Sequence, residues 1–298
     1  MRTKSWEVGD VVVTKVYESR LARDSIFSML PIVDADLGPY RSWMAPFLGP
    51  DDEMVMDVHA FCIEADGQRI VVDTCVGNDR HYESDLFASI FNGLHTSFLA
   101  DLESVGFGPT TVDTVICTHL HPDHIGYNTV RTEAGWEPTF RNARYVMSRG
   151  DVDVWRKGFT ELGGPVADDS TLAFTTSVEP VVAAGQAELV EPEEFRVSAS
   201  VSLMATPGHT PDHFSVMIRS RGATGLITGD AVHTPVQLAR PEWSLNADAD
   251  AEVSAQTRRS LVERFAGSDT LVMGTHFPDP TAGYIVADGA GWRFEGAR

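Results

Sequence analysis

The sequence is poor in basic residues, and this shortage limits its partners. Lysine and arginine total 23 against 43 aspartate and glutamate residues, so 298 residues carry a formal net charge of -20. Binding to nucleic acid or to an anionic membrane surface needs clustered lysine and arginine side chains. We therefore expect no nucleic-acid partner and no membrane partner.

Cysteine is also scarce. Cys62, Cys75 and Cys117 are the three in the chain, and no two of them form a C-x-x-C pair. An odd number of widely spaced cysteines argues against a disulfide framework and against a thiolate zinc site. Each one lies in an apolar, strand-like run, so we expect buried, reduced thiols.

Long apolar runs are absent as well. A membrane helix needs roughly 18 consecutive apolar residues, and no segment reaches that length. The N-terminal stretch MRTKSWEVGDVVV has no apolar core followed by a small-residue cleavage site. With 43% hydrophobic and 22% charged residues, the composition is that of a globular protein, and we expect it to be cytoplasmic.

Strand-like runs recur along the chain, with helical patterns between them. Alternating or continuous apolar runs predict strands at 8–18, 58–65, 69–74, 112–118, 144–147, 200–205, 214–219, 224–229 and 270–274. Helical periodicity predicts helices at 84–104, 150–157 and 249–266. Residues 160–180 give no clear pattern. Runs of strands with interspersed helices indicate a sheet sandwich flanked by helices, α+β or α/β in class.

Residues 20–56 interrupt this pattern. The segment holds four prolines among aromatic and aliphatic residues, including Phe27, Trp43 and Phe47. Loops of this length are usually functional or disordered. The aromatic content favours a packed lid, or a surface through which two copies form a homodimer, over disorder.

Four potential metal ligands fall within six residues directly after a predicted buried strand. They are His119, His121, Asp123 and His124 in the motif H-x-H-x-D-H. Alternate residues at a strand end point the same way, so His119 and His121 can share one ion. The chain then turns at Pro122, which lets the next two ligands face a second ion. Imidazole and carboxylate ligands suit zinc best, with manganese, iron and cobalt as alternatives.

Three further candidate ligands follow three other predicted strands. His209 comes after 200–205, Asp230 after 224–229 and His276 after 270–274, each beyond a short turn that contains glycine. Side chains at several strand ends meet at one edge of a sheet, as a metal site requires. These positions therefore strengthen the prediction of a metal centre.

Together these residues resemble the metallo-β-lactamase fold superfamily. The resemblance runs from about residue 58 to the C-terminus, and Val72-Asp73-Thr74 looks like that family's first motif. It implies an α+β fold, an αβ/βα four-layer sandwich built as a single domain over residues 1–298, with 20–56 as an N-terminal extension. It also implies two divalent metal ions, the first held by His119, His121 and His209, the second by Asp123, His124 and His276, with Asp230 bridging them.

The resemblance also implies a mechanism. Two cations that share a water lower its pKa toward neutrality, so a bridging hydroxide becomes the nucleophile. Asp123 lies beside that position and is expected to accept its proton, which makes it a catalytic residue as well as a ligand. Asp73 is expected to support the ligands rather than to bind metal.

Finer details resemble the lactonase and organophosphate-hydrolase (methyl parathion hydrolase-like) branch. They are the N-terminal extension, the phrase Thr206-Pro207-Gly208-His209-Thr210-Pro211, and His276-Phe277-Pro278 followed by Gly283. This likeness implies hydrolysis of a lactone or ester, such as an acyl-homoserine lactone or a related small neutral substrate.

Two positions depart from that branch. Many quorum-signal lactonases carry a tyrosine three residues after the bridging aspartate, where this chain has His233. His233 either replaces the tyrosine as a catalytic hydrogen-bond donor or lines the pocket. Many relatives have glycine where Cys75 follows Thr74.

Three other residues are candidates near the site. His213 is equally open to a structural or a functional role, and Trp155 and Phe159 are candidates for the pocket wall.

Other activities compete with lactone or ester hydrolysis. Within the same fold these are a glyoxalase-II-like thioesterase, a phosphotriesterase and a β-lactamase. From another class come an iron-dependent oxidoreductase and a non-catalytic metal protein. Seven intact ligand positions with an open bridging position favour catalysis.

Overall fold

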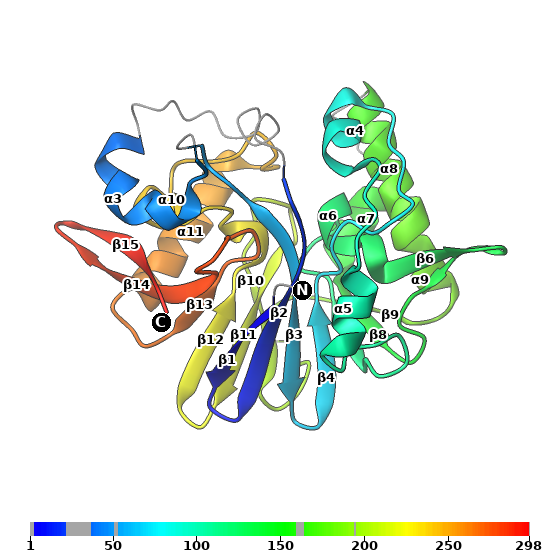
Figure 1. Ribbon diagram of the computed structural model, residues 1–298, viewed down its shortest axis with the longest axis horizontal. Helices are drawn as coiled ribbons and strands as arrows, with labels where there is room; N and C mark the ends of the chain where they lie inside the picture. Colours follow the sequence, from blue (N-terminus) through cyan, green and yellow to red (C-terminus); the bar gives the residue numbers. More distant parts are fainter. Residues whose placement is uncertain (1–2, 22–36, 51–52, 159–163, 194, 298) are drawn as a thin grey trace. The chain divides into compact units, whose positions relative to one another are not determined.

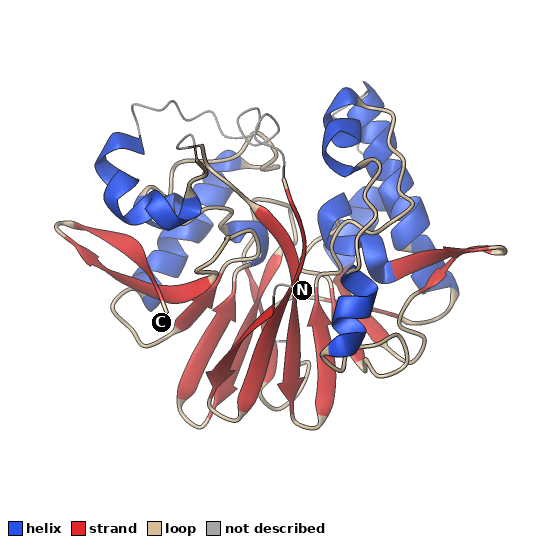
Figure 2. Ribbon diagram, viewed as in Figure 1, coloured by secondary structure: helices blue, strands red, loops and turns tan. Residues whose placement is uncertain are grey.

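The computed structural model describes residues 3–21, 37–50, 53–158, 164–193 and 195–297. Contacts within the chain divide it into two compact units. Unit 1 comprises residues 1–7, 11–19 and 58–191, and unit 2 comprises 8–10, 20–57 and 192–298. Both helices and strands occur in the chain (Figure 2), and each unit contains both. Within the described ranges, no helix is long and apolar enough to cross a membrane.

Unit 1 is built on a seven-stranded sheet. In spatial order its strands are β1 (Thr3–Val8), β2 (Val11–Arg20), β3 (Asp57–Ala65), β4 (Gln68–Val72), β5 (Thr114–Ile116), β8 (Arg144–Ser148) and β9 (Ala187–Val190). β4, β5, β8 and β9 run parallel to one another. Parallel strands end at the same edge, so the loops after β4 and β5 lie side by side.

Helices follow these strands in unit 1 (Figure 1). They are α4 (Asp85–Phe91), α5 (Phe98–Ser104), α6 (Pro122–Ile125), α7 (Arg149–Arg156), α8 (Gly164–Ser177) and α9 (Glu179–Ala183), with a 3-10 turn η3 at Gly126–Asn128. A separate hairpin joins β6 (Thr129–Thr132) to β7 (Gly135–Pro138). The short helix α6 begins at Pro122, whose fixed φ suits the first helical position.

Unit 2 is built on a six-stranded sheet. In spatial order its strands are β10 (Val201–Ala205), β11 (Phe214–Ser220), β12 (Ala223–Ile227), β13 (Leu271–Met273), β14 (Ala282–Asp288) and β15 (Gly291–Gly296). β12 and β13 form its parallel pair. The crossover between them carries η4 (Gly229–Ala231), α10 (Val236–Ala239) and α11 (Ala251–Phe265), as a parallel connection requires.

The described part of the predicted lid packs into unit 2. Residues 22–36 and 51–52 lie outside the described residues, and the remainder forms η1 (Gly38–Tyr40), α3 (Arg41–Met44) and η2 (Ala45–Phe47). α3 and α10 both contact β15 (Figure 1). The Phe47 ring lies 6.1 Å from that of Phe277 and 5.7 Å from that of Phe294. Phe47 is thus part of the core of unit 2, while most of the other residues of 37–50 are exposed or half-buried.

Most predicted strands are confirmed, with one exception at the N-terminus. The strand expected at 8–18 is interrupted, because β1 ends at Val8 and β2 begins at Val11. Gly9 has a φ of +62°, which permits the turn between them.

The helix expected at 84–104 is two helices. α4 ends at Phe91 and α5 begins at Phe98. The Asn92 side chain forms two hydrogen bonds with the Tyr82 backbone, and Gly93 has a φ of +75°. These features end the first helix although the apolar period continues through the break.

Several segments for which the sequence pattern predicts no helix or strand form regular secondary structure. α8 covers most of the unclear stretch at 160–180, and β9, the β6–β7 hairpin and the β14–β15 hairpin were not predicted. The three cysteines are free and buried, as expected. Burial raises the pKa of each thiol.

Candidate metal centre

The H-x-H-x-D-H motif of unit 1 begins in the loop after β5, with His119 and His121, and ends inside α6, with Asp123 and His124. His119 and His124 are each about 1% exposed, and the Nε2 atom of His119 lies 3.0 Å from the Nδ1 atom of His121. The His124 Nε2 atom lies 3.8 Å from Oδ2 of Asp123. The rings of His119 and His124 lie 4.1 Å apart between centroids, so all four predicted ligands of the motif lie close together.

Asp73 fixes the orientation of this loop from the end of β4. Its Oδ1 accepts a hydrogen bond from the Thr118 backbone N–H at 2.8 Å. Its Oδ2 lies 3.0 Å from the Nδ1 atom of His124. A carboxylate can only accept, so Nδ1–H of His124 is the donor and the Nε2 lone pair remains for a ligand role. The supporting role expected for Asp73 matches this geometry.

Glu18, on β2, fixes the neighbouring loop after β4. Its two carboxylate oxygens accept the backbone N–H groups of Val76 at 2.8 Å and Gly77 at 3.1 Å. Burial, assisted by the charge of Asp123, raises the pKa of Glu18 to about 7 against the hydrogen bonds that lower it. The same loop meets the motif, because the Gly126 N–H donates to the Cys75 carbonyl oxygen at 2.7 Å.

Unit 2 gathers three imidazoles around the carboxylate of Asp230. The Nε2 atoms of His209 and His233 lie 3.4 and 3.1 Å from Oδ2. The Nε2 atom of His276 lies 3.2 Å from Oδ1. All four side chains are buried, with exposed fractions between 2 and 5%. We call these residues, His209, Asp230, His233 and His276, the Asp230 cluster.

Strand ends and tight turns place the members of this cluster. His209, Asp230 and His276 follow β10, β12 and β13, as the sequence predicts. The turn before His209 needs glycine, since Gly208 has a φ of +127° and a Cβ there would overlap the Ser254 backbone nitrogen.

Two of the imidazoles are held through Nδ1. Nδ1–H of His209 donates to Oδ1 of Asp248 at 2.9 Å, and Nδ1–H of His276 donates to the Asp57 carbonyl oxygen at 2.9 Å. Both rings therefore present Nε2 to Asp230. Holding the second ring nitrogen in this way is typical of metal-bound histidine.

Asp248 was not predicted from the sequence. It lies in the loop before α11, and its Oδ2 is 3.5 Å from Nη1 of Arg258, with both side chains fully buried. Burial alone would raise the pKa of Asp248, but the hydrogen bond from His209 and the nearby charges hold it well below its usual range. No motif marks this aspartate, so only the fold reveals its role.

His213 and His233 both lie close to Asp230 but have different surroundings. Nε2 of His213 accepts the Asp230 backbone N–H at 2.9 Å, and its Nδ1 lies 3.0 Å from the Thr206 carbonyl oxygen. His213 thus has a structural role that shapes the turn at Asp230. Burial lowers the pKa of His233, with the charge of Asp230 opposing this effect.

The chemistry of the donors fits divalent metal ions. Ligands about 2.0–2.2 Å from a common ion lie roughly 3–3.5 Å from each other. Within the Asp230 cluster the nitrogen–oxygen separations are 3.1 to 3.4 Å, and the two histidine nitrogens of the motif loop are 3.0 Å apart. Each unit therefore presents buried donor atoms at the spacing of metal ligands.

Comparison with known proteins decides the family. Residues 55–276, about three quarters of the chain, match the metallo-beta-lactamase superfamily. The chain belongs to the metallo-beta-lactamase superfamily. This match confirms the family predicted from the sequence.

Two curated proteins share limited identity with the chain. An N-acyl homoserine lactonase of Bacillus cereus is 23% identical over 205 residues, 65% of this chain and 71% of that protein. Metallo-beta-lactamase domain-containing protein 1 of Xenopus laevis is 29% identical over 135 residues, 45% of this chain. That second match spans 43% of the Xenopus protein, less than half of its length.

Solved structures confirm the predicted metallo-β-lactamase fold of α+β class. Hydrolase AbOPH, of the beta lactamase superfamily, gives a TM-score of 0.79 at 22% identity, covering 99% of this chain and 97% of that chain. AidC, a dizinc quorum-quenching lactonase, gives 0.77 at 16% identity with the same coverage.

The structure gives a setting to Cys75 and to one of the residues expected to line the pocket. Cys75 is fully buried with a φ of +58°, a conformation that glycine adopts more readily. Of the two expected pocket-wall residues, Trp155 packs its ring 5.7 Å from that of His121, and Phe159 lies outside the described residues.

Proposed function

We propose that this protein is a binuclear metal-dependent hydrolase that opens a lactone or ester. The observation that carries the proposal is the convergence of buried imidazoles on the Asp230 carboxylate, which has no evident use other than metal binding. The ligands proposed are His119, His121, Asp123, His124, His209, Asp230 and His276, and the metal proposed is zinc.

Two ions held by these residues would supply Lewis acidity toward a carbonyl oxygen and lower the pKa of a water molecule. The protein's own part is to orient and protect. Asp73 and Asp248 hold Nδ1–H of His124 and His209, so each ring keeps one tautomer and one direction. The side chain of Asp123 is 13% exposed, against 2% for that of Asp73. We assign to Asp123 the transfer of a proton away from the attacking water.

The proposed substrate class rests on the relatives and on charge. An N-acyl homoserine lactonase is among the curated relatives, and a lactonase is among the structures that share the fold. The net charge of -20 disfavours polyanionic substrates and does not oppose a neutral lactone or ester. A small neutral substrate, such as an acyl-homoserine lactone, is therefore the proposed class.

A substrate panel tests the proposal. Protein loaded with zinc, manganese or cobalt would be assayed on acyl-homoserine lactones, aryl esters, thioesters, phosphotriesters and β-lactams. We expect the highest kcat/KM on a lactone or an ester. A clear preference for thioesters, phosphotriesters or β-lactams would replace the proposed substrate class, and iron as the resident metal with no hydrolysis would favour the oxidoreductase.

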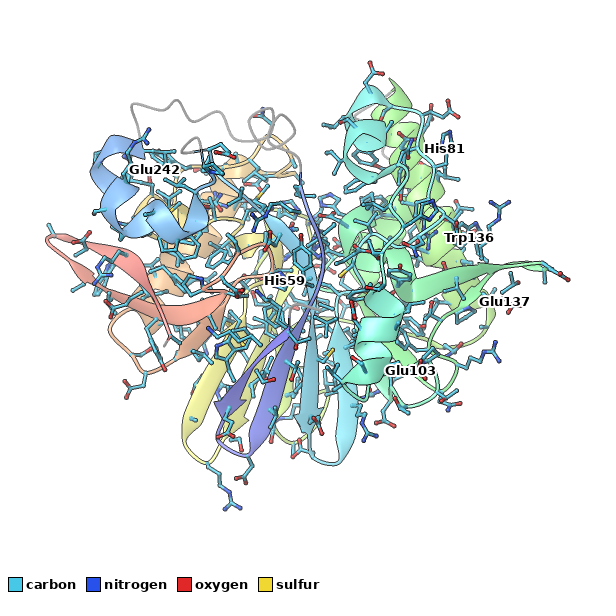
Figure 3. All side chains as sticks on the ribbon, viewed as in Figure 1. His59, His81, Glu103, Trp136, Glu137 and Glu242 are labelled. Atoms are coloured by element: carbon cyan, nitrogen blue, oxygen red, sulfur yellow. The ribbon has the colours of Figure 1, made fainter. Side chains whose placement is uncertain are left out.

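The variant Asp230→Ala tests the role of the metal in the same assay. Removing this carboxylate leaves the Nε2 atoms of His209, His233 and His276 without their shared partner. We expect loss of both metal loading and hydrolysis in a protein that keeps its circular dichroism spectrum. Full activity in folded Asp230→Ala would contradict the proposal. His81→Phe, at an exposed histidine of unit 1 labelled in Figure 3, is the matched control.

A further inference from the structure

Arg258 is a fully buried charged residue of unit 2. It lies on α11, and its side chain is 0% exposed. Burial lowers the pKa of its guanidinium, and the charge of Asp248 opposes this effect. A buried charge is costly unless it is paired and hydrogen-bonded, and apolar residues can often replace a buried ion pair without loss of stability. Stability alone is therefore a weak reason for an arginine at this position.

The guanidinium of Arg258 contacts three separate segments of unit 2. Its Nη1 lies 3.4 Å from the Ala231 carbonyl oxygen and 3.5 Å from Oδ2 of Asp248. Its Nε donates to the Pro241 carbonyl oxygen at 2.7 Å, and its Nη2 donates to Oγ of Ser244 at 2.5 Å. Arginine carries its donors in a rigid planar fork, which suits it to hold several acceptors in one arrangement.

Two of these segments adjoin proposed metal ligands. Ala231 directly follows Asp230, so the guanidinium holds the turn that carries this carboxylate. Asp248 accepts Nδ1–H of His209 at 2.9 Å, so the same guanidinium also holds the group that orients this imidazole. Nε2 of His209 lies 3.4 Å from Oδ2 of Asp230. One nitrogen of Arg258 thus links the supports of two neighbouring donor atoms.

The helix that carries Arg258 also holds the turn before His209. One helical position before Arg258, Oγ1 of Thr257 donates to the Pro207 carbonyl oxygen at 2.6 Å. α11 is therefore fixed to the turn of His209, and Arg258 extends from this helix to the turn of Asp230. The two turns are held by adjacent residues of one helix.

We propose that Arg258 is a positioning residue for the metal ion that His209 and Asp230 share. It acts on His209 through Asp248 and on Asp230 through the Ala231 carbonyl oxygen. The inference rests on the proposed function, because it requires these two ligands to bind metal. Arg258 contacts neither donor atom, so its effect is on their spacing and therefore on metal affinity.

Metal binding by the variant Arg258→Gln tests the inference. Glutamine keeps a polar amide but removes the charge and the fork. The assay titrates Co²⁺ into wild type and variant in competition with a chelating dye, which gives the affinity for each ion. Loss of a residue that supports a ligand costs roughly 10- to 100-fold in metal affinity. We expect a loss of this size for one of the two ions. Arg259→Gln, at the next and exposed arginine of the same helix, is the matched control and should bind as wild type does.

A double variant shows whether Arg258 acts through Asp248. Asp248→Asn removes the carboxylate that links the guanidinium to His209. Residues that act through one another have non-additive effects. We therefore expect Asp248→Asn/Arg258→Gln to lose less affinity than the product of the two single losses. A loss equal to that product would show independent effects and contradict the proposed link.

A second substitution keeps the test decisive if glutamine prevents folding. Arg258→Lys keeps a positive charge but lacks the planar fork that reaches Asp248 and Ala231 together. We expect it to lose affinity at the lower end of the same range. Wild-type affinity in a folded lysine variant would contradict the positioning role.

The outcomes separate this inference from the proposed function. If wild-type protein binds no cobalt, the proposed function fails together with the inference. Urea unfolding of the metal-free variants measures stability separately from affinity. If wild type binds two ions and folded Arg258→Gln binds them equally tightly, the inference alone is overturned, even where the variant is less stable.

Discussion

The carboxyl group of Glu18 gives a quantitative prediction about stability and pH. Glu18 is 6% exposed, and burial raises the pKa of its carboxyl group from an ordinary value of 4.5 to about 7. The folded protein therefore binds this proton more tightly than the unfolded chain does. The resulting stability is fully present below about pH 4.5 and is lost as the pH rises through about 7.

The magnitude follows from the same two values. The pKa of Glu18 rises from 4.5 in the unfolded chain to about 7 in the folded protein. At about 1.4 kcal/mol per pKa unit, this difference changes the free energy of unfolding by about 3 kcal/mol in total, and about 2.5 kcal/mol of that change occurs between pH 5 and pH 8. Glu18→Gln removes this titration. The amide also turns an N–H₂ group toward one of the Val76 and Gly77 N–H donors, a cost of about 1–3 kcal/mol that does not vary with pH.

The assay is urea unfolding of both proteins in a chelating buffer between pH 5 and pH 8. We compare the free energy of unfolding of Glu18→Gln with that of wild type at each pH. Whatever this difference is at pH 5, we expect it to shift by about 2–3 kcal/mol in favour of Glu18→Gln by pH 8. Glu64→Gln, at an exposed carboxylate on β3, is the control. Its free energy of unfolding should differ from that of wild type by the same amount at every pH. A constant difference between Glu18→Gln and wild type at every pH would refute the reasoning.

Two further substitutions test the supports of the site. Asp248→Asn should weaken metal affinity roughly 10- to 100-fold. It should also lower the free energy of unfolding by about 3 kcal/mol, because buried Arg258 loses its charge partner. Metal titration and urea unfolding measure the two effects, and wild-type values in both would contradict a supporting role for Asp248. Gly126→Ala should lower the free energy of unfolding by about 2 kcal/mol or more, because its Cβ would overlap the Val76 carbonyl oxygen. Gly38→Ala, whose Cβ meets nothing within 4 Å, is its control, and equal stability of the two variants would contradict the packing described for the loop after β4.

The sequence identifies candidate ligands because they follow predicted strands and carry their own local signals. The buried runs before His119, His209 and His276 are short and apolar, and glycine-containing turns follow the last two strands. Period and turn chemistry are local properties, so they can be seen in one sequence. The ligand assignments themselves remain a proposal.

The missed features depend on contacts between distant residues. Asp248 meets His209 across 39 residues, and Glu18 meets Val76 across 58. Neither residue lies in a motif, so no local pattern distinguishes them from exposed carboxylates in a chain this acidic. The break after α4 was missed because the apolar period continues across it, while the Asn92 side chain and Gly93 end the helix.

Metal content tests the central claim most directly. Elemental analysis of purified wild-type protein, with Asp230→Ala beside it, gives the number of transition-metal ions per chain. We expect about two ions per chain in wild type and fewer in the variant. One ion or none in active wild-type protein would contradict the binuclear centre.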